Sequence, residues 1–317
     1  MDTKGAWGST GASAEIDLST LTTESADPRY GELDTLDVAT LAAAMNEAEA
    51  EVPVAVRAAL PQITTAIEQI VDRLRAGGRV LYVGAGTPGR LGVLDASECP
   101  PTFSTDPETV QGVIAGGPAA LRDAVEGAED DTAAGAALVD ERRITSADAV
   151  VGLTASGRTP YVLAAIEAAR AAGALTVGVS CNAGAALSAV AELAVEVVVG
   201  PEIVSGSTRL KAGSAQKQVL NMISTVSMVR LGKTYGTLMV DVAATNAKLR
   251  VRARRLVEQI AEVDPQTAES ALAASGGHVK VAAVMLVHGV ERPRAEQWLA
   301  DADGRLRTVL ETSPAST

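Results

Sequence analysis

The stretch RVLYVGAGTPGRLGVLDASECPPT, residues 79–102, joins a short apolar run to a glycine-rich turn and then to a helical pattern. Residues 80–83 are apolar at four successive positions, as expected for a strand that is buried on both faces. The turn at 84–90 follows directly, and such turns connect a strand to a helix in βαβ units. We therefore predict that this stretch begins a parallel sheet.

Four further runs of the same character follow, separated by helical stretches. This alternation predicts an α/β fold: a parallel sheet of about five strands flanked by helices on both faces. We divide the chain into a loose tail (1–20), an N-terminal helical segment (21–66), an α/β domain (67–232), and C-terminal helices with a small three-helix module (233–317). The predicted strands are 79–83, 109–115, 147–153, 174–180 and 193–199, and helices are predicted over 36–75, 208–231 and 246–261.

The composition argues against several classes of protein. Of the 317 residues, 47% are hydrophobic, which is enough for one large core, while aromatic residues make up only 2% and the formal charge is −12. Nucleic-acid readers need a basic face and stack bases on aromatic side chains, so we expect no nucleic-acid partner. No apolar run is long enough to span a bilayer and the first twenty residues contain no apolar signal segment, so we expect no membrane partner.

Cysteine and histidine usage indicates a cytoplasmic protein without a metal. Cys99 and Cys181 make no disulfide framework and suit a reducing compartment, and we expect Cys99 to be a buried packing thiol. His278 and His288 are the two histidines, and neither has a metal-ligand partner at short spacing. We therefore expect no metal site.

Three loops rich in glycine, serine and threonine, at 84–90, 154–160 and 205–211, have the character of anion sites. Helix N-termini collect anions, and ligands of open parallel sheets lie beyond the carboxyl ends of the strands. The first loop lacks the pattern of a dinucleotide-binding fingerprint, and no loop has a Walker sequence, so we predict a phosphate site without a nucleotide cofactor. Thr159 is expected to cap a helix that begins at Pro160. The candidate phosphate-binding residues are Gly86, Thr87, Ser156, Gly157, Thr159, Ser207 and Lys211.

Two glutamates stand out by their position. Pro100 disfavours a helical conformation at Cys99, so we expect Glu98 at the C-terminal end of the helix that follows the first loop. There it would face the negative end of the helix dipole, a setting that suits a general acid. Glu129 follows Gly127, which loosens the local helix. Both are candidates for acid–base chemistry, and the alternative for both is a solvated carboxylate.

Taken together, these segments resemble the N-acetylmuramic acid 6-phosphate etherases of bacterial cell-wall recycling. The similarity runs from about Leu21 to the C-terminal helices, nearly the whole chain. It implies a sugar isomerase domain over 67–232, related to the glucokinase regulatory proteins, and a homodimer with sites near the interface. The matching stretches are LTTE (21–24), GAGT (84–87), GRLG (89–92), LDASECPPT (94–102), VEGAED (125–130), ASGRTPYV (155–162), 206–217, Asn221 and 236–249, which contains LMVD (238–241) and ATN (244–246).

The resemblance also implies a reaction and its residues. Glu98 would be the proton donor and Glu129 the second active-site carboxylate, acting on a phosphorylated amino sugar without a cofactor. The implied reaction breaks the D-lactyl ether at C3 of N-acetylmuramic acid 6-phosphate, giving N-acetylglucosamine 6-phosphate and D-lactate. With the sugar ring open, the C1 aldehyde acidifies the C2 proton. Glu129 can then remove that proton while Glu98 protonates the departing oxygen, and water adds at C3.

The sequence departs from the family pattern at three positions. Pro88 stands where a serine is usual, Asp27 where an asparagine is usual, and Ala48 where an acidic residue is usual. Pro88 removes one hydroxyl and one backbone donor, so Thr87 and the 154–160 loop become the better phosphate ligands.

The spacing along the first helix bears on assembly. Ten residue steps separate Pro88 from Glu98, which is about 15 Å along a helix and longer than a sugar phosphate. Either the phosphate lies at the 154–160 loop of the same chain, or Glu98 reaches into the site of a partner chain. We favour a site shared by two chains.

Two other functions could use the same kind of site. A non-catalytic sugar-phosphate-binding regulator, like the glucokinase regulatory proteins, would need neither glutamate, but such proteins contain two of these domains and this chain has room for one. An aldose–ketose isomerase of sugar phosphates would need one base on an open-chain sugar. Release of D-lactate, or an isomerised sugar in its place, distinguishes the three functions.

Overall fold

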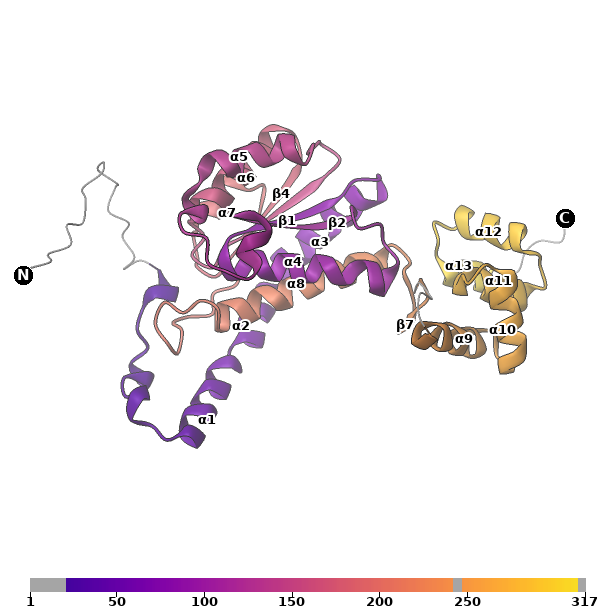
Figure 1. Cartoon of the computed structure of the whole chain (residues 1–317), viewed down its shortest axis with the longest axis horizontal. Coiled ribbons are helices and arrows are strands. Elements are labelled where there is room, and N and C mark those ends of the chain that lie inside the picture. The colour runs from indigo at the N-terminus through magenta and orange to yellow at the C-terminus, as the bar shows by residue number, and fades with distance from the viewer. Residues whose placement is uncertain (1–20, 242–246, 313–317) are drawn as a thin grey trace, which may run out of the picture.

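The computed structural model describes residues 21–241 and 247–312 (Figure 1). The predicted tail over 1–20 and the matching residues Ala244, Thr245 and Asn246 lie outside the described residues. The predicted α/β fold is confirmed, because five parallel strands form one sheet in the order β2-β1-β3-β4-β5. The strands are β1 (Val80–Gly84), β2 (Val110–Ile114), β3 (Ala149–Leu153), β4 (Leu175–Ser180) and β5 (Leu193–Glu196).

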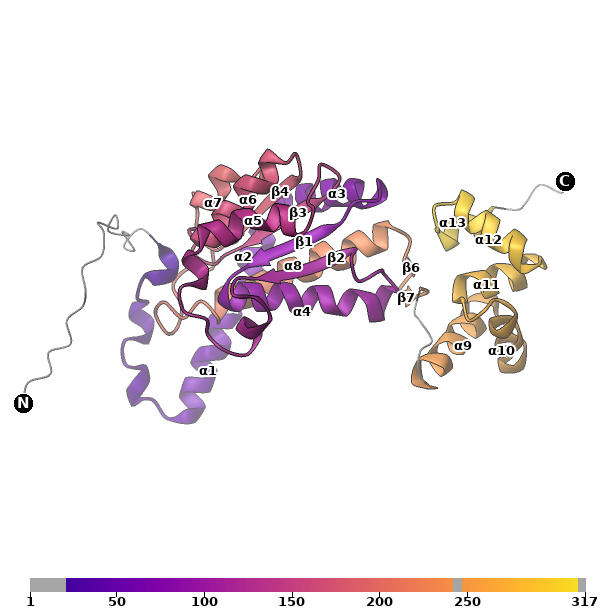
Figure 2. The same ribbon diagram turned by 45° about the horizontal axis from the view of Figure 1, so that its top comes forward.

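Helices cover both faces of the sheet (Figure 2). Successive residues of a strand point to opposite faces, so Tyr82 of β1 packs into one core cluster, whereas Leu81 and Val83 pack into the other. The layer on the Tyr82 face consists of α3 (Leu60–Arg75), α4 (Gly86–Phe103) and α8 (Lys211–Arg230). The layer on the opposite face consists of α5 (Thr132–Glu141), α6 (Pro160–Ala171) and α7 (Ala186–Val190).

The N-terminal helical segment is broken into three helices where the periodicity predicts one pattern: α1 (Val38–Glu49), α2 (Val52–Ala58) and α3. Asp37 begins α1 by accepting a hydrogen bond from the backbone N–H of Thr40, and a proline lies in the first turn of both α2 and α3. Figure 1 shows α1 projecting away from the sheet, and Ala48 is its one buried residue.

The C-terminal part has its own core. A short hairpin of β6 (Thr234–Tyr235) and β7 (Leu238–Met239) precedes α9 (Ala247–Ala261). Four short helices follow instead of the predicted three, because the chain turns at Asp303 and Gly304, at φ +53° and +71°, so that one helix ends and another begins. The predicted cap at Asp264 is confirmed, since its carboxylate accepts from the N–H groups of Gln266 and Thr267. These helices are α10 (Pro265–Ala274), α11 (Val279–His288), α12 (Arg292–Asp301) and α13 (Leu306–Glu311).

Trp298 of α12 packs half-buried against this C-terminal core and meets the ring of His288 edge-on, with the ring centroids 5.4 Å apart. Within the part of the chain that the structure describes, no single helix has the length and apolar character to cross a membrane.

Candidate functional site

The order of the strands favours a candidate ligand site at the carboxyl ends of β1 and β3. The chain leaves β1 in one direction to reach β2 and lies on the other side of β1 when it forms β3, so the connections diverge between these strands. Ligands of open parallel sheets bind at such a switch point. The loops at 84–90 and 154–160 begin there, so two of the three predicted anion loops meet at one edge of the sheet.

The first loop is a tight turn that begins α4. Gly86 has φ +55°, and a Cβ at Gly89 would lie 2.7 Å from the carbonyl oxygen of Gly84, so the first turn of α4 packs directly on the strand end. The side chain of Thr87 is directed to the start of α8, where its methyl carbon lies 3.7 Å from the position of a Cβ on Gly213. Pro88 lies in the first turn of α4, where a missing N–H breaks no helical hydrogen bond.

The second loop is held by its own hydroxyl groups. The Thr154 hydroxyl lies 2.7 Å from that of Thr159 and 3.3 Å from that of Ser156, which also accepts from the backbone N–H of Arg158 at 3.2 Å. The helix α6 begins at Pro160 as predicted, but the predicted cap is wrong: Thr159 makes no side-chain cap bond, because its hydroxyl bonds to Thr154. Gly157 has φ +74°.

A residue that the sequence reasoning missed ties this loop to the N-terminal segment. Asn182 is 3% exposed, and its amide nitrogen donates to the Thr23 hydroxyl and to the carbonyl oxygen of Ala155, both at 3.0 Å. Its amide oxygen accepts from the Thr22 hydroxyl at 2.9 Å. The available signal was a polar residue two positions after the run that forms β4.

The third loop differs from the expectation. The helix α8 begins at Lys211, and the carboxylate of Glu202 accepts from the backbone N–H groups of Lys211 and Ala212, so an internal anion already fills this helix N-terminus. Burial raises the pKa of Glu202, and these hydrogen bonds oppose that rise. The ammonium of Lys211 is buried and lies 2.9 Å from the carboxylate of Glu51. The structure therefore places Lys211 in an internal ion pair, while Ser207 lies half-buried in the loop before it.

Glu129 and the first loop line a common cavity. Glu129 is exposed in the short helix η6 (Ala128–Asp130), and it lines a cavity of about 380 Å³ together with Gly86 and Arg90. The sequence reasoning did not assign Arg90 a role, although its position in the first turns after the glycine-rich loop was a signal.

Glu98 lies elsewhere, and the prediction that its helix ends beside it is wrong. The helix α4 runs through Pro100 and Pro101 to Phe103, so Glu98 is exposed on the body of the helix, five residues before its end. Proline removes helical hydrogen bonds, but Phe103 is 7% exposed and packs in the core, which stabilises the last turn. Glu98 does not line the cavity that contains Glu129.

Next to Glu98, Cys99 is a packing thiol as predicted. It is 2% exposed, and burial raises its pKa to about 12, so the thiol is neutral near pH 7. On the same helix the buried Asp95 pairs with the ammonium of Lys217 at 2.6 Å.

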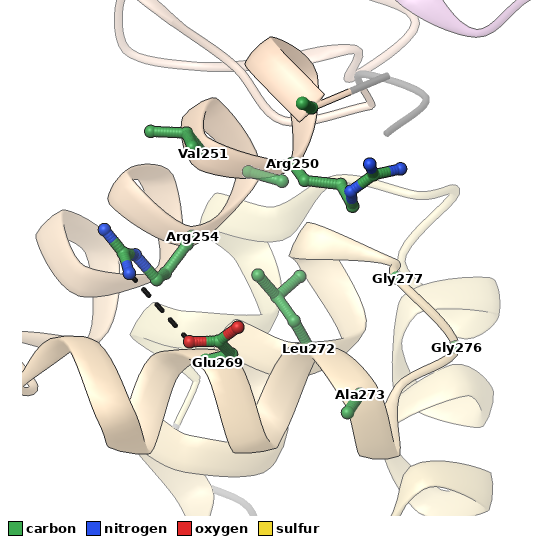
Figure 3. A pocket seen from close by; sticks show the side chains of 10 residues that line it. Arg250, Val251, Arg254, Glu269, Leu272, Ala273, Gly276 and Gly277 are labelled. Atoms are coloured by element: carbon green, nitrogen blue, oxygen red, sulfur yellow. Dashed lines mark ion pairs between the residues drawn. The ribbon is translucent and has the colours of Figure 1, made fainter. Parts of the chain in front are cut away.

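A separate cavity of about 590 Å³ lies in the C-terminal part between α9 and α10 (Figure 3). Arg250 and Arg254 line it from α9, Glu269 lines it from α10, and Gly276 and Gly277 close one end. It contains none of the predicted site residues. Among the described residues, no group of three or more His, Cys, Asp or Glu side chains is placed to hold a metal ion.

The chain is similar to a known family model and, at low sequence identity, to solved structures. Residues 62–170 match the model of the glucokinase regulatory protein N-terminal SIS domain. Among solved structures, the c3406 protein of E. coli CFT073 is 16% identical with a TM-score of 0.46, covering 63% of this chain and 96% of that chain. A phosphoheptose isomerase from Francisella tularensis is 16% identical with a TM-score of 0.42, covering 61% and 100%. The five-stranded parallel sheet with its flanking helices is a sugar isomerase (SIS) fold.

Curated relatives are similar over nearly the full length. The N-acetylmuramic acid 6-phosphate etherase of Streptomyces avermitilis is 54% identical, over 95% of this chain and 97% of that protein. Those of Mycolicibacterium smegmatis and Rubrobacter xylanophilus are 52% and 56% identical, over 93% and 92% of this chain and 99% and 97% of theirs. The chain belongs to the N-acetylmuramic acid 6-phosphate etherase family.

Proposed function

We propose that this chain is a carbon–oxygen lyase that cleaves the D-lactyl ether of N-acetylmuramic acid 6-phosphate to N-acetylglucosamine 6-phosphate and D-lactate. The observation that carries this function is 54% identity to a relative of that name over 95% of the chain. The substrate is a small sugar phosphate. The enzyme would act in the recycling of cell-wall amino sugars in the cytoplasm.

The phosphate is proposed to lie at the switch point between β1 and β3. Ser156 and Thr159 would supply hydroxyls from the second loop and Thr87 one from the first, with Gly86 and Gly157 allowing close approach of the backbone. The sugar would extend across the end of β1 to the cavity lined by Glu129. Lys211 would join the phosphate site only if its pair with Glu51 opened, so we give it no direct role.

The chemistry follows from two carboxylates. Glu129 takes the C2 proton of the open-chain sugar, the C3–oxygen bond breaks, and Glu98 gives a proton to the departing lactate oxygen. Water then adds its oxygen to C3 of the unsaturated aldehyde and C2 receives a proton, which balances the hydrolysis.

The test is incubation of the protein with N-acetylmuramic acid 6-phosphate in ¹⁸O-labelled water, with detection of D-lactate and mass analysis of both products. We expect D-lactate without label and a sugar with the label at C3. Label in lactate would indicate attack on the lactyl carbon. A binding regulator would release no lactate, and an aldose–ketose isomerase would give an isomerised sugar phosphate.

A homodimer is proposed on the basis of α1. Val38, Leu41 and Met45 recur at helical spacing on this helix, yet Val38 is 84% exposed and only Ala48 is buried. A twelve-residue helix is marginal in water without packing partners, so this stripe requires a covering surface. A groove of about 650 Å³ between α3 and α8, lined by Ile67, Met222 and other apolar residues, is a surface of suitable character.

A further inference from the structure

Among the described residues, Arg90 is the one with a positive charge that lines the cavity containing Glu129. It lies one turn into α4, and its guanidinium donates from Nε to the carbonyl oxygen of Leu121 at 3.2 Å and from Nη2 to that of Asp123 at 3.3 Å. Within residues 21–241 and 247–312, no ion pair involves Arg90. Its positive charge is therefore held in place by neutral acceptors.

This arrangement leaves the guanidinium with donors to spare. A guanidinium carries five N–H donors in a planar fork, and the two main-chain carbonyls use two of them. The remaining donors match the two oxygens of a carboxylate. Because the loop fixes the side chain in advance, binding an anion would cost little side-chain entropy.

The other charged residues of the cavity make Arg90 necessary for any anionic group. Asp123, Glu126 and Glu129 also line it, and their carboxylates would repel a negatively charged ligand. The helix N-terminus at Gly86 also favours an anion, but Gly86 belongs to the first loop, which is proposed to bind the phosphate. Arg90 is thus the residue of the cavity able to offset this repulsion.

Resting on the function proposed above, we propose that Arg90 binds the lactyl carboxylate of the substrate. Glu129 acts at C2, and the ether oxygen leaves from the adjacent C3, so the lactyl group must lie beside Glu129. Its carboxylate is one carbon away from the ether oxygen. The C6 phosphate is at the opposite end of the sugar, toward the hydroxyl-rich loop on the β3 side of β1. The guanidinium of Arg90, which lines the same cavity as Glu129, would therefore contact the lactyl carboxylate of the substrate.

The experiment compares two ligands and three proteins. The ligands are N-acetylmuramic acid 6-phosphate and its lactyl amide, which replaces the carboxylate by a neutral group of similar shape. The proteins are the natural chain, Arg90→Gln, and Arg122→Gln. Arg122 is an exposed arginine between Leu121 and Asp123, and it does not line the cavity. We expect Arg90→Gln to lower kcat/KM for the acid by roughly 10- to 150-fold, the range of a hydrogen bond to a charged group, with little effect on the amide. Arg122→Gln should change neither.

An equal loss for acid and amide in Arg90→Gln would mean that Arg90 only holds the loop, and this would overturn the proposal. Where the amide is not turned over, its inhibition constant gives the same comparison. Inhibition by N-acetylglucosamine 6-phosphate, which has a phosphate and no carboxylate, should be unchanged, and a weakened effect would assign Arg90 to the phosphate instead. If Arg90→Gln fails to fold, Arg90→Lys keeps the charge without the fork and should still lose affinity for the acid selectively. Failure of the natural protein to release lactate would reject the proposed function itself.

Discussion

At the scale of single residues, Glu98 and Glu129 are both exposed, but they lie in different surroundings. Glu129 lines the cavity that contains Arg90, whereas Glu98 does not line it. Glu98→Gln and Glu129→Gln should each keep the fold and lose lactate release by ~10²–10⁴-fold, the usual contribution of an acid–base group. The measurement is D-lactate release, with circular dichroism to check folding and the exposed Glu141→Gln as the control. Near-natural rates in a folded variant would remove that glutamate from the mechanism.

Ser156 belongs to a different kind of interaction. Its hydroxyl accepts from the N–H of Arg158 and faces the Thr154 hydroxyl, so it both shapes the loop and is proposed to bind phosphate. Ser156→Ala should mainly raise KM, because phosphate binding is largely shared by the ground and transition states. Steady-state kinetics measure this directly. A large fall in kcat with unchanged KM would show that the loop acts in the chemical step.

At the scale of elements, the inner strands β1, β3 and β4 could be predicted because they are buried on both faces and leave nearly continuous apolar runs. The edge strands β2 and β5 are less buried, and the alternation with helical stretches indicated them as well. The start of α6 at Pro160 could also be predicted from a local signal, because proline suits the first turn of a helix. The end of α4 could not be predicted, because burial of Phe103 in the tertiary core overrides the local effect of Pro100. The partners of Lys211 and Asn182 could not be predicted either, because Glu51 and Thr23 lie 160 and 159 residues away in sequence.

The amino ends of β1 and β3 are joined by an ion pair between the partly exposed Arg79 and the buried Asp148. Asp148 is 2% exposed and accepts from Nε and Nη2 of Arg79 at 3.0 and 2.8 Å. Burial alone would raise the pKa of Asp148, but the hydrogen bonds from Arg79 and from Thr145 outweigh burial and lower it. The folded pKa thus lies below the unfolded value, so the stabilisation is present above about pH 4 and is lost as pH falls through the folded pKa.

Asp148→Asn should therefore reduce the free energy of unfolding by ~1.5–3 kcal/mol at pH 7, because it removes the charged acceptor of Arg79, whose side chain is partly exposed. The difference from the natural protein should shrink below about pH 4. Urea unfolding at several pH values measures both. The control is Asp72→Asn, whose exposed pair with Arg75 at 3.6 Å should be worth under ~1 kcal/mol. A pH-independent difference would assign the effect to packing.

The close packing of α4 on the sheet depends on the absence of a side chain at Gly112 of β2. A Cβ there would lie 2.4 Å from the Cα of Val93, and backbone cannot yield as a flexible side chain can. Gly112→Ala should displace α4, with a loss of ~1–3 kcal/mol or more of stability and reduced turnover. Thermal unfolding and lactate release test this together. Gly213→Ala in α8, whose Cβ would meet its nearest atom at 3.6 Å, should leave stability equal or higher.

At the scale of the whole molecule, the length of α4 separates Glu98 from the cavity that contains Glu129. The N-terminal end of this helix contributes Gly86 and Arg90 to the cavity. Glu98 lies eight residues beyond Arg90 on the same helix, which is about 12 Å. A general acid must lie within ~3 Å of the proton acceptor or be connected to it by one bridging water. We therefore propose that the Glu98 that completes this cavity comes from a partner chain, in a homodimer with two equivalent sites.

Mixing inactive chains tests this arrangement. Glu98→Ala and Glu129→Ala proteins, each inactive alone, are unfolded together and refolded so that chains pair at random. If each site takes its two glutamates from different chains, half of the dimers are mixed and each mixed dimer contains one intact site, so roughly a quarter of all sites recover. Lactate release measures the recovery, native mass spectrometry verifies the mixed dimers, and refolded natural protein sets full activity. Verified mixed dimers without activity would place both glutamates on one chain, and α4 would then have to move on substrate binding to bring Glu98 within reach.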